Sequence, residues 1–274
     1  MEKKNYVLEP GRKIPVREKV DVLVAGGGPA GIAAAISAAR LGVRTMLVER
    51  YGYLGGMITG SHVVWVLGVG DGYHPKARGI IQEIRQRLEP LEAVTPGNEC
   101  GDYAVDAEVF KWQAAEMIEE SGGQILLHTL ACQPILQGNR VCGLYTESKS
   151  GRQAILASVV VDCTADADIA YRGGCPCDNQ THDVTLRIVL EGVDERKVKS
   201  FAAEEPRRYQ EIIEKATSLN GGVLPNQTRY LKNIDVTDAT SLSRTEIQVR
   251  KECFTALYFL RKNLPGWEKV RVRE

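Results

Sequence analysis

The fold is decided by residues 21–49, DVLVAGGGPAGIAAAISAARLGVRTMLVE. The stretch opens with the apolar run 22–25, which is short and rich in β-branched residues and predicts a strand buried on both faces. Gly26, Gly28 and Gly31 follow in the spacing Gly-x-Gly-x-x-Gly, and the Ala-rich segment 30–40 predicts a helix close to a sheet. A second buried strand is predicted at 45–48, directly before Glu49.

Each of these residue types has a physical role. Gly26 permits a tight turn from strand to helix, Gly28 leaves room for a pyrophosphate, and Gly31 lets helix and strand pack closely. The helix N-terminus offers free N–H groups to the phosphates. Glu49 can accept hydrogen bonds from both ribose hydroxyls of an adenosine. An ordinary glycine-rich turn in another α/β domain is the alternative, but the complete context favours a dinucleotide site.

The composition narrows the function classes. Lys+Arg and Asp+Glu are both 35, so no basic stripe points to nucleic acid. The charged N-terminus lacks the apolar core of a signal peptide, and no apolar run reaches the length of a membrane span. We therefore expect a cytoplasmic protein without a nucleic-acid or membrane partner. Seven cysteines at irregular spacing do not form a disulfide framework, and no metal site is expected. The close pair Cys175 and Cys177 could be redox-active or bind a metal, although a structural role is favoured.

The rest of the chain extends the α/β pattern. The glycine-rich segment 50–60 predicts a loop whose backbone comes close to the same cofactor. Asp106 is expected to cap a helix that runs to residue 120. Strand-like pieces at 124–129, 132–136, 140–147 and 153–161 predict an antiparallel meander inserted in a parallel domain. The last strand runs into a turn at Thr164, on the ligand side of the sheet.

Three regions are predicted along the chain. Residues 1–171 form the dinucleotide-binding domain, and residues 172–243 form a smaller α+β domain on the substrate side. Residues 244–274 are expected to hold a helix that leads back toward the first domain. Ser243 and Glu246 match a capping box at the start of this helix, which is predicted to extend to Asn263. The predicted fold class is α/β, with a Rossmann-like domain of parallel strands plus the antiparallel β-meander.

Five segments of the sequence resemble the FAD-dependent oxidoreductases of the glutathione-reductase/fumarate-reductase type, related to the flavin subunit of heterodisulfide reductase. These segments are VLVAGGGPAGIAAAISAARLGVRTMLVER, YGYLGGMITG, the helix 106–123, SGRQAILASVVVDCTADADIA and LSRTEIQVRKECFTALYFLRKNLPG. The resemblance covers most of the chain and implies a non-covalently bound FAD. It also implies a set of cofactor-binding residues: Gly26, Gly28, Pro29, Ala30 and Gly31 at the pyrophosphate; Glu49 at the ribose; Arg50 and Ala131 at the adenine; Gly55, Gly56 and Met57 toward the flavin; and Thr164, Ala165 and Asp166 closing over the cofactor.

The sequence departs from the family pattern at two points. Ala165 stands where the family usually has glycine. The family chain also continues beyond the last helix and returns to the first domain with a further glycine-rich turn. That return segment is absent here, so we expect the chain to be a fragment, the alternative being that a partner supplies the missing part.

The function expected from this resemblance is FAD-dependent transfer of hydride or electrons between the flavin and a small-molecule substrate or a redox partner. An iron–sulfur protein is the expected type of electron partner, and oligomerisation stays open. No catalytic residue can be named from the sequence. Two alternatives remain, a nicotinamide-dependent dehydrogenase and a truncated, non-catalytic flavin-binding module that relays electrons.

Overall fold

The computed structural model describes residues 9, 11–68, 77–97, 101–178, 183–222, 224–225 and 230–273. Contacts within the chain divide it into two compact units, Met1–Cys177 and Asp178–Glu274. The roles assigned from the sequence to residues 172–243 and 244–274 stay predictions. None of the helices in the described ranges combines the length and the hydropathy that a membrane-spanning helix requires.

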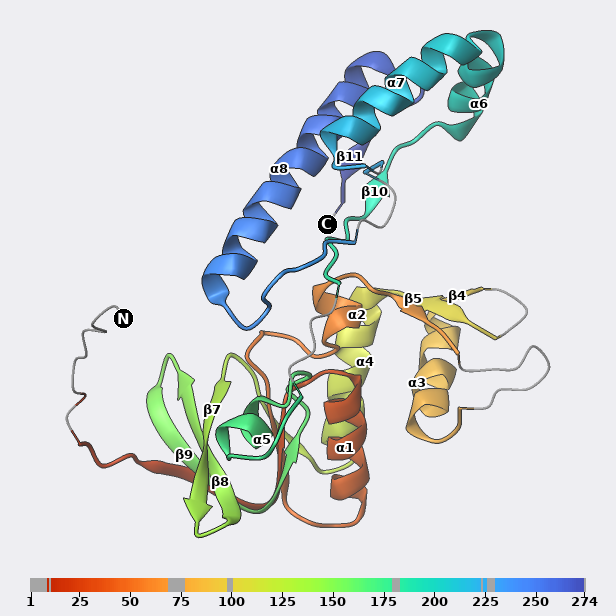
Figure 1. The fold of residues 1–274 in the computed structure, drawn as a ribbon. Helices are drawn as coiled ribbons and strands as arrows, with labels where there is room; N and C mark the ends of the chain where they lie inside the picture. Colours follow the sequence, from red (N-terminus) through yellow and green to blue (C-terminus); the bar gives the residue numbers. More distant parts are fainter. Residues whose placement is uncertain are drawn as a thin grey trace, which may run out of the picture. The chain divides into compact units, whose positions relative to one another are not determined.

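The first unit contains helices on both sides of one large sheet (Figure 1). Its elements, in chain order, are β1 (Val16–Ala25), α1 (Pro29–Arg40), β2 (Thr45–Val48), α2 (Met57–Gly60), β3 (Trp65–Val66), α3 (Ile80–Leu88), the 3-10 helix η1 (Glu89–Leu91), β4 (Val94–Pro96), β5 (Tyr103–Val105), α4 (Ala107–Glu120), β6 (Gln124–Leu126), β7 (Leu130–Gln137), β8 (Arg140–Ser148), β9 (Gly151–Asp162) and α5 (Asp168–Arg172). Strands β3, β5 and β4 form a separate small antiparallel sheet.

The large sheet has the strand order β6-β2-β1-β9-β8-β7. Strands β6, β2, β1 and β9 are parallel, whereas β9, β8 and β7 pair antiparallel. Strand β9 thus belongs to both parts, and the predicted combination of a parallel sheet with an antiparallel meander is confirmed. One detail of the prediction is wrong, because residues 124–126 form a parallel edge strand beside β2 instead of joining the meander. Helix α4 supplies the crossover that brings this strand back parallel.

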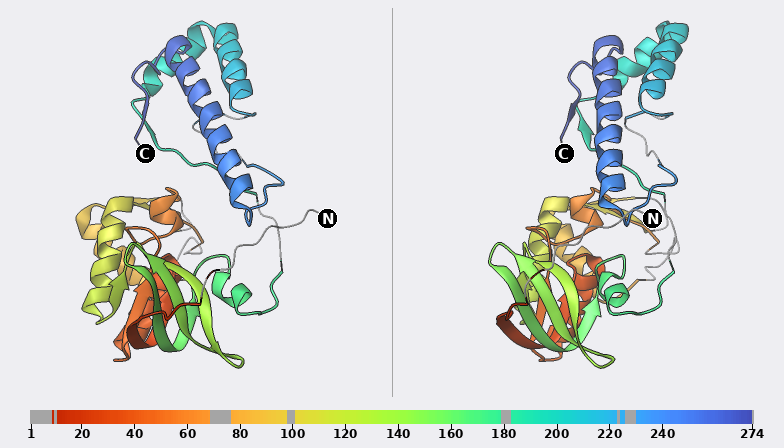
Figure 2. Two further views of the ribbon diagram at one scale, coloured as in Figure 1. Left: turned by 90° about the vertical axis from the view of Figure 1, so that its left-hand side faces the viewer. Right: turned by 60° about the vertical axis from the view of Figure 1, so that its left-hand side comes forward.

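The central strands are buried on both faces, as their apolar sequences predict. Val24 faces a core shared with α1, α3 and α4, and α1 and α4 lie side by side (Figure 1). Leu23 faces a second core, which the meander strands complete together with Ile169 of α5. Helix α5 lies beside the meander strands (Figure 2). Both Leu23 and Val24 have no exposed surface. The carboxyl ends of these strands are therefore held in a fixed position by packing on two sides.

The N-terminal caps of two helices differ in how well the sequence predicted them. Asp106 accepts hydrogen bonds from the backbone N–H groups of Glu108 and Val109, which confirms the predicted start of α4. Helix α8 (Ala239–Asn263) begins earlier than predicted, because the side chain of Asp238 caps it. Ser243 lies inside the first turns and its hydroxyl donates to the carbonyl of Ala239. The predicted capping box at Ser243 is therefore wrong.

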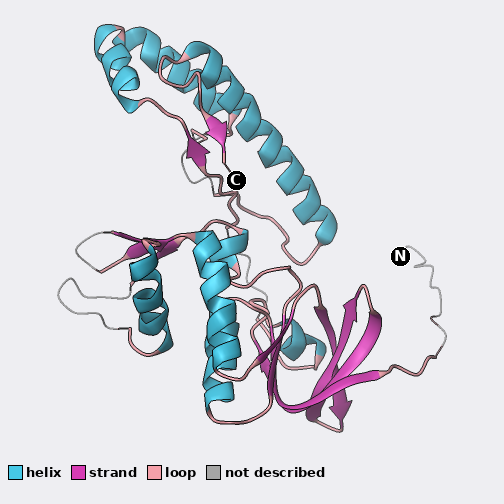
Figure 3. Cartoon of the chain, turned by 180° about the vertical axis from the view of Figure 1, so that it is seen from behind, coloured by secondary structure: helices cyan, strands magenta, loops and turns pink. Residues whose placement is uncertain are grey.

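The second unit consists mainly of helices (Figure 3). It contains β10 (Leu190–Glu191), α6 (Glu195–Glu204), α7 (Pro206–Leu219), α8 and β11 (Arg271–Val272). Glu205 separates α6 from α7, which begins at Pro206. A small core is built from Phe201 of α6, Ala216 of α7 and Leu257 of α8, and strands β10 and β11 pair antiparallel.

Candidate cofactor site

Four loops meet at the carboxyl edge of the parallel sheet. Backbone hydrogen bonds join them just beyond the strands: the N–H of Gly26 donates to the carbonyl of Val48 at 2.9 Å, and the N–H of Cys163 donates to that of Ala25 at 2.8 Å. The N–H of Glu49 donates to the carbonyl of Leu126 at 3.0 Å. The loops that follow β1, β2, β6 and β9 are therefore neighbours, although they are far apart in the sequence. This edge is where open α/β sheets bind ligands.

The glycines after β1 are present for different structural reasons. A Cβ atom on Gly31 would lie 1.8 Å from the carbonyl oxygen of Gly26, and one on Gly26 would lie 2.2 Å from that of Cys163. No side chain fits at either position. Gly28 is different, because its backbone is extended and the nearest atom to an added Cβ is the Cα of Gly56 at 3.8 Å. The chain itself does not require glycine at residue 28, and the open space there matches the room that a pyrophosphate needs.

Helix α1 begins next to this open space. Pro29 occupies its first turn, no side chain caps its N-terminus, and its first turn carries no acidic residue. The first N–H groups of a helix have no partner within the helix. Pro29, Ala30 and Gly31 thus form a helix N-terminus that is suited to an anionic group.

Glu49 connects the loops after β1 and β2. Its carboxylate accepts hydrogen bonds from the N–H of Gly27 at 2.6 Å and from the N–H of Tyr51 at 2.8 Å, and the residue is 8% exposed. An ionised carboxylate has about four acceptor positions. Two acceptor positions therefore remain for the hydroxyls of a ribose, and the residue has a structural role in addition to the predicted ribose contact.

The second glycine loop packs directly on the first. The N–H of Gly55 donates to the carbonyl of Gly27 at 2.8 Å, and an added Cβ on Gly56 would lie 2.9 Å from the Cα of Gly28. Both Gly55 and Gly56 have positive φ, 113° and 54°. Met57 follows at the start of α2 and is exposed. The structure thus brings the predicted flavin-proximal loop against the predicted pyrophosphate loop.

Two further predicted contact residues lie beside Glu49. The exposed side chain of Arg50 packs over the ring of Tyr51, with 4.9 Å between the guanidinium carbon and the ring centre. The N–H of Thr129, just before β7, donates to the carbonyl of Glu49 at 2.8 Å. Ala131 of β7 is buried in the second core of the sheet. A ligand at this position would therefore meet the backbone near Ala131 instead of its side chain.

The turn after β9 is organised by Asp162, a residue that the sequence analysis did not select. One carboxylate oxygen accepts from the N–H and the hydroxyl of Thr164, at 3.1 Å and 2.7 Å, and the other accepts from the N–H groups of Ile169 and Ala170 at 3.0 Å and 2.9 Å. Burial alone would raise the pKa of Asp162, but these hydrogen bonds outweigh it and hold the pKa below its ordinary value. The signal in the sequence that could have identified Asp162 is its position as an acidic residue directly after the apolar run 159–161.

Ala165 and Asp166 form the exposed tip of this turn. Ala165 has a φ of 78°, in the left-handed region that favours glycine. Ala165 therefore replaces the usual glycine of the family at a position where the backbone has the conformation that glycine adopts most easily. The hydroxyl of Thr164 accepts from the N–H of Asp168 at 2.9 Å and holds the turn against the start of α5.

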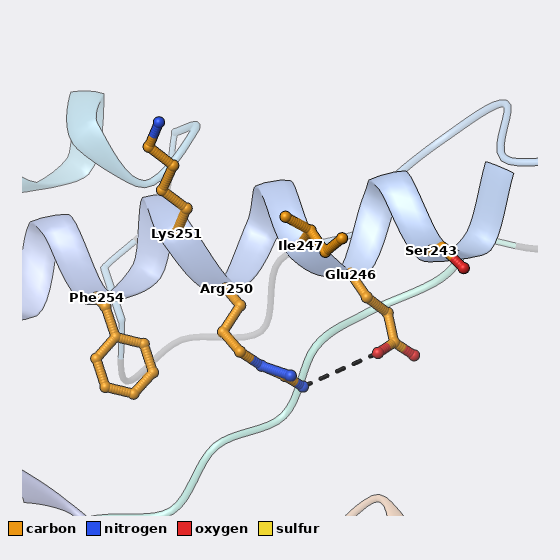
Figure 4. A pocket seen from close by; sticks show the side chains of 6 residues that line it. All are labelled: Ser243, Glu246, Ile247, Arg250, Lys251 and Phe254. Atoms are coloured by element: carbon orange, nitrogen blue, oxygen red, sulfur yellow. Dashed lines mark ion pairs between the residues drawn. The ribbon is translucent and has the colours of Figure 1, made fainter. Parts of the chain in front are cut away.

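A pocket in the second unit contains none of the predicted cofactor residues. Six residues of α8 line it: Ser243, Glu246, Ile247, Arg250, Lys251 and Phe254 (Figure 4). Arg250 and Glu246 form an ion pair of 4.0 Å along the helix.

Comparisons with known proteins identify the family of the chain. The family model of the FAD dependent oxidoreductases matches residues 21–274. A digeranylgeranylglycerophospholipid reductase from Methanoculleus marisnigri is 30% identical over 172 residues, which are 58% of this chain and 42% of that protein. A thiamine thiazole synthase from Sulfolobus acidocaldarius is 28% identical over 229 residues, 82% of this chain and 78% of that protein.

A solved structure supports the fold. The geranylgeranyl bacteriochlorophyll reductase-like protein from Thermoplasma acidophilum has a TM-score of 0.50 at 20% identity, covering 65% of this chain and 48% of that chain. The chain spans about two fifths of the length of the curated reductases that it matches. Because the family match extends over most of the sequence, the chain belongs to the FAD-dependent oxidoreductases, and FAD is its cofactor.

Proposed function

We propose that the carboxyl edge of the large sheet holds FAD without a covalent bond. In this proposal Gly28 and the N-terminus of α1, with Pro29, Ala30 and Gly31, bind the pyrophosphate, and Glu49 binds the adenosine ribose. The observation that carries the proposal is the space beside Gly28, which is bordered by Gly56 and faces the helix N-terminus. That arrangement supplies room and N–H donors at one point.

The remaining predicted contacts extend the proposed site in both directions. Arg50 and the backbone near Ala131 border the adenine, and Gly26 sets the turn that positions the pyrophosphate loop. Gly55, Gly56 and Met57 border the ribityl chain and the flavin. Thr164, Ala165 and Asp166 close over the same cofactor, held in place by Asp162. Positive φ at Gly55 and Gly56, together with the hydrogen bond from the N–H of Gly55 to the carbonyl of Gly27, supports a loop whose backbone is held close to the pyrophosphate loop and hence to a ligand there.

Bound FAD supplies transfer of hydride or electrons. The residues of this chain position the cofactor, and no residue is assigned a catalytic role. We propose a small-molecule substrate or a redox protein as the second reactant, and an iron–sulfur protein as the electron partner. The resemblance to the flavin subunit of heterodisulfide reductase supports this choice of partner. The named relatives of this chain include reductases and thiamine thiazole synthases, so they support a redox family and leave its substrate open.

An anaerobic redox experiment tests the proposed activity. The full chain is loaded with FAD and desalted. Its reduced form, prepared with light and EDTA as the electron donor, is mixed with ferricyanide or oxidised ferredoxin, and its oxidised form is mixed with reduced ferredoxin. We expect electron transfer to or from the bound cofactor at a rate that differs from that of free FAD and saturates with ferredoxin concentration. Transfer at the rate of free FAD, with no saturation, would show that the chain does not direct the reaction and would contradict the proposal.

A further inference from the structure

The loop Cys175-Pro176-Cys177 lies at the end of α5 and presents both cysteines to solvent. The helix ends at Arg172 and the chain turns at Gly174, whose φ is 85°. The N–H of Cys175 then donates to the carbonyl of Ala170 at 3.0 Å. The turn therefore holds Cys175 against the last carbonyls of the helix, while its thiol remains accessible.

The spacing of the two cysteines along the chain allows them to form a bond with each other. Residues two apart along a chain are separated by at most about 7 Å between Cα atoms, and disulfides form at about 4.4–6.8 Å. The thiol of Cys177 donates to the backbone carbonyl of Cys175, with 3.5 Å between Sγ and oxygen. The side chain of Cys177 is thus directed back toward Cys175. Pro176 limits the backbone freedom between them.

The other described cysteines are less accessible than this pair. Cys132, Cys142 and Cys163 are partly buried, and Cys253 is buried. Burial raises the pKa of the thiols of Cys132 and Cys163. Since the thiolate is the nucleophile in exchange with disulfides, burial and a raised pKa both slow the reaction at those residues. An oxidant in solution would therefore meet Cys175 and Cys177 in preference to them.

We propose that Cys175 and Cys177 form a thiol–disulfide exchange site that accepts low-molecular-weight disulfides such as glutathione disulfide. One thiolate of the pair attacks a sulfur of glutathione disulfide, which forms a mixed disulfide and releases one glutathione. The second thiolate attacks the protein sulfur of that mixed disulfide, which forms the Cys175–Cys177 bond and releases the second glutathione. The two cysteines are oxidised, glutathione disulfide is reduced to two glutathiones, and the two protons of the cysteine thiols pass to them.

The bond formed in this way is expected to be reversible. A disulfide that closes so short a loop gains little from restricting the unfolded chain. Exposed and strained disulfides have the higher reduction potentials typical of labile or regulatory bonds. The pair is thus suited to exchange and poorly suited to a structural disulfide. The inference rests on the loop alone and does not depend on FAD.

Differential alkylation of the purified full chain tests the proposal. The chain is reduced, desalted and incubated with glutathione disulfide, and its thiols are then alkylated and located by peptide mass spectrometry. In the wild type we expect residues 175 and 177 to lose both alkylatable thiols and the peptide that contains them to carry an internal Cys175–Cys177 disulfide. Dithiothreitol should restore both thiols. Cys253 should stay reduced throughout.

Single variants identify the second step. Cys177→Ser should accumulate a stable glutathione adduct on Cys175, and Cys175→Ser should accumulate one on Cys177, whereas Cys142→Ser should behave as the wild type. Far-UV circular dichroism confirms that each variant is folded. Equal adduct levels in the wild type and in Cys177→Ser would overturn the proposal, because the second thiol would then not resolve the first. Unreacted thiols at both positions in the wild type would overturn it as well.

Discussion

Replacing Glu49 by glutamine removes a connection on which the candidate cofactor site depends. The carboxylate accepts one hydrogen bond from the N–H of Gly27 and one from the N–H of Tyr51, at 2.6 Å and 2.8 Å, and it is 8% exposed. Glutamine has nearly the same shape but offers only one oxygen. Its amide nitrogen would face a backbone donor, so one hydrogen bond is lost and one buried donor is left without a partner.

The size of the effect follows from the two contacts. A hydrogen bond to a charged group contributes about 1.5–3 kcal/mol, and a buried unsatisfied group costs about 1–3 kcal/mol. These two contributions overlap, because both describe the loss of the same contact, so we expect Glu49→Gln to lower the local stability of the two loops by about 2–4 kcal/mol. At the lower end of this range the loops open about 30-fold more often, since about 1.4 kcal/mol corresponds to a factor of ten.

Amide hydrogen exchange measures this change where it occurs. The N–H groups of Gly27 and Tyr51 should exchange at least about 30-fold faster in Glu49→Gln than in the wild type. Glu119→Gln is the matched control, because Glu119 is an exposed side chain on α4, and it should leave both rates unchanged. Unchanged protection of Gly27 and Tyr51 in Glu49→Gln would refute the argument that the carboxylate holds the two loops together.

Three further substitutions test the rest of the site. Asp162→Asn should lower the free energy of unfolding at pH 7 by about 2 kcal/mol, because it disrupts hydrogen bonds to a charged acceptor. The folded-state pKa of Asp162 lies below its ordinary value of 3.8. Its contribution is thus complete above that value and is lost as the pH falls through the folded pKa. Urea titrations should therefore show the gap between variant and wild type closing in acid, and a gap that widens there would contradict this. Ala165→Gly should stabilise the chain by about 0.5–1 kcal/mol in the same titration, because it removes the strain of an alanine in the left-handed backbone conformation. The control Ala170→Gly in α5 should instead destabilise the chain. A loss of stability in Ala165→Gly would contradict the prediction. Gly31→Ala should destabilise the chain by about 3 kcal/mol, because its methyl group meets the carbonyl of Gly26, whereas Gly28→Ala should stay within about 0.5 kcal/mol of the wild type. Equal losses in these two glycine variants would contradict the different roles assigned to them.

The sequence predicted the parts of the fold that are determined by residues close to one another in the chain. Such local interactions determine the strand at 22–25, the glycine-rich turn and the helix that follows it. The contact between Gly31 and Gly26 is one example, since both residues belong to one turn. The same holds for the cap at Asp106, whose partners are the next residues of the helix.

The features that the sequence analysis missed depend on partners that are distant in the chain or on competing signals. Asp162 is an organising residue only because its turn brings the N–H groups of Ile169 and Ala170 to its carboxylate. The structural role of Glu49 needs Gly27, which lies on another strand end. At α8 two capping residues compete, and Asp238 precedes Ser243, so the helix begins at the earlier one.

The most direct test of the FAD site is the visible absorption spectrum of the full chain after incubation with FAD and desalting, compared between wild type, Gly28→Ala and Gly11→Ala. Gly11 is the control, because an added Cβ there meets nothing within 4 Å. We expect wild type and Gly11→Ala to keep the flavin bands and Gly28→Ala, although folded, to lose them, since its methyl group occupies the space proposed for the pyrophosphate. Flavin bands retained equally by Gly28→Ala would contradict the central claim that the pyrophosphate lies against residue 28.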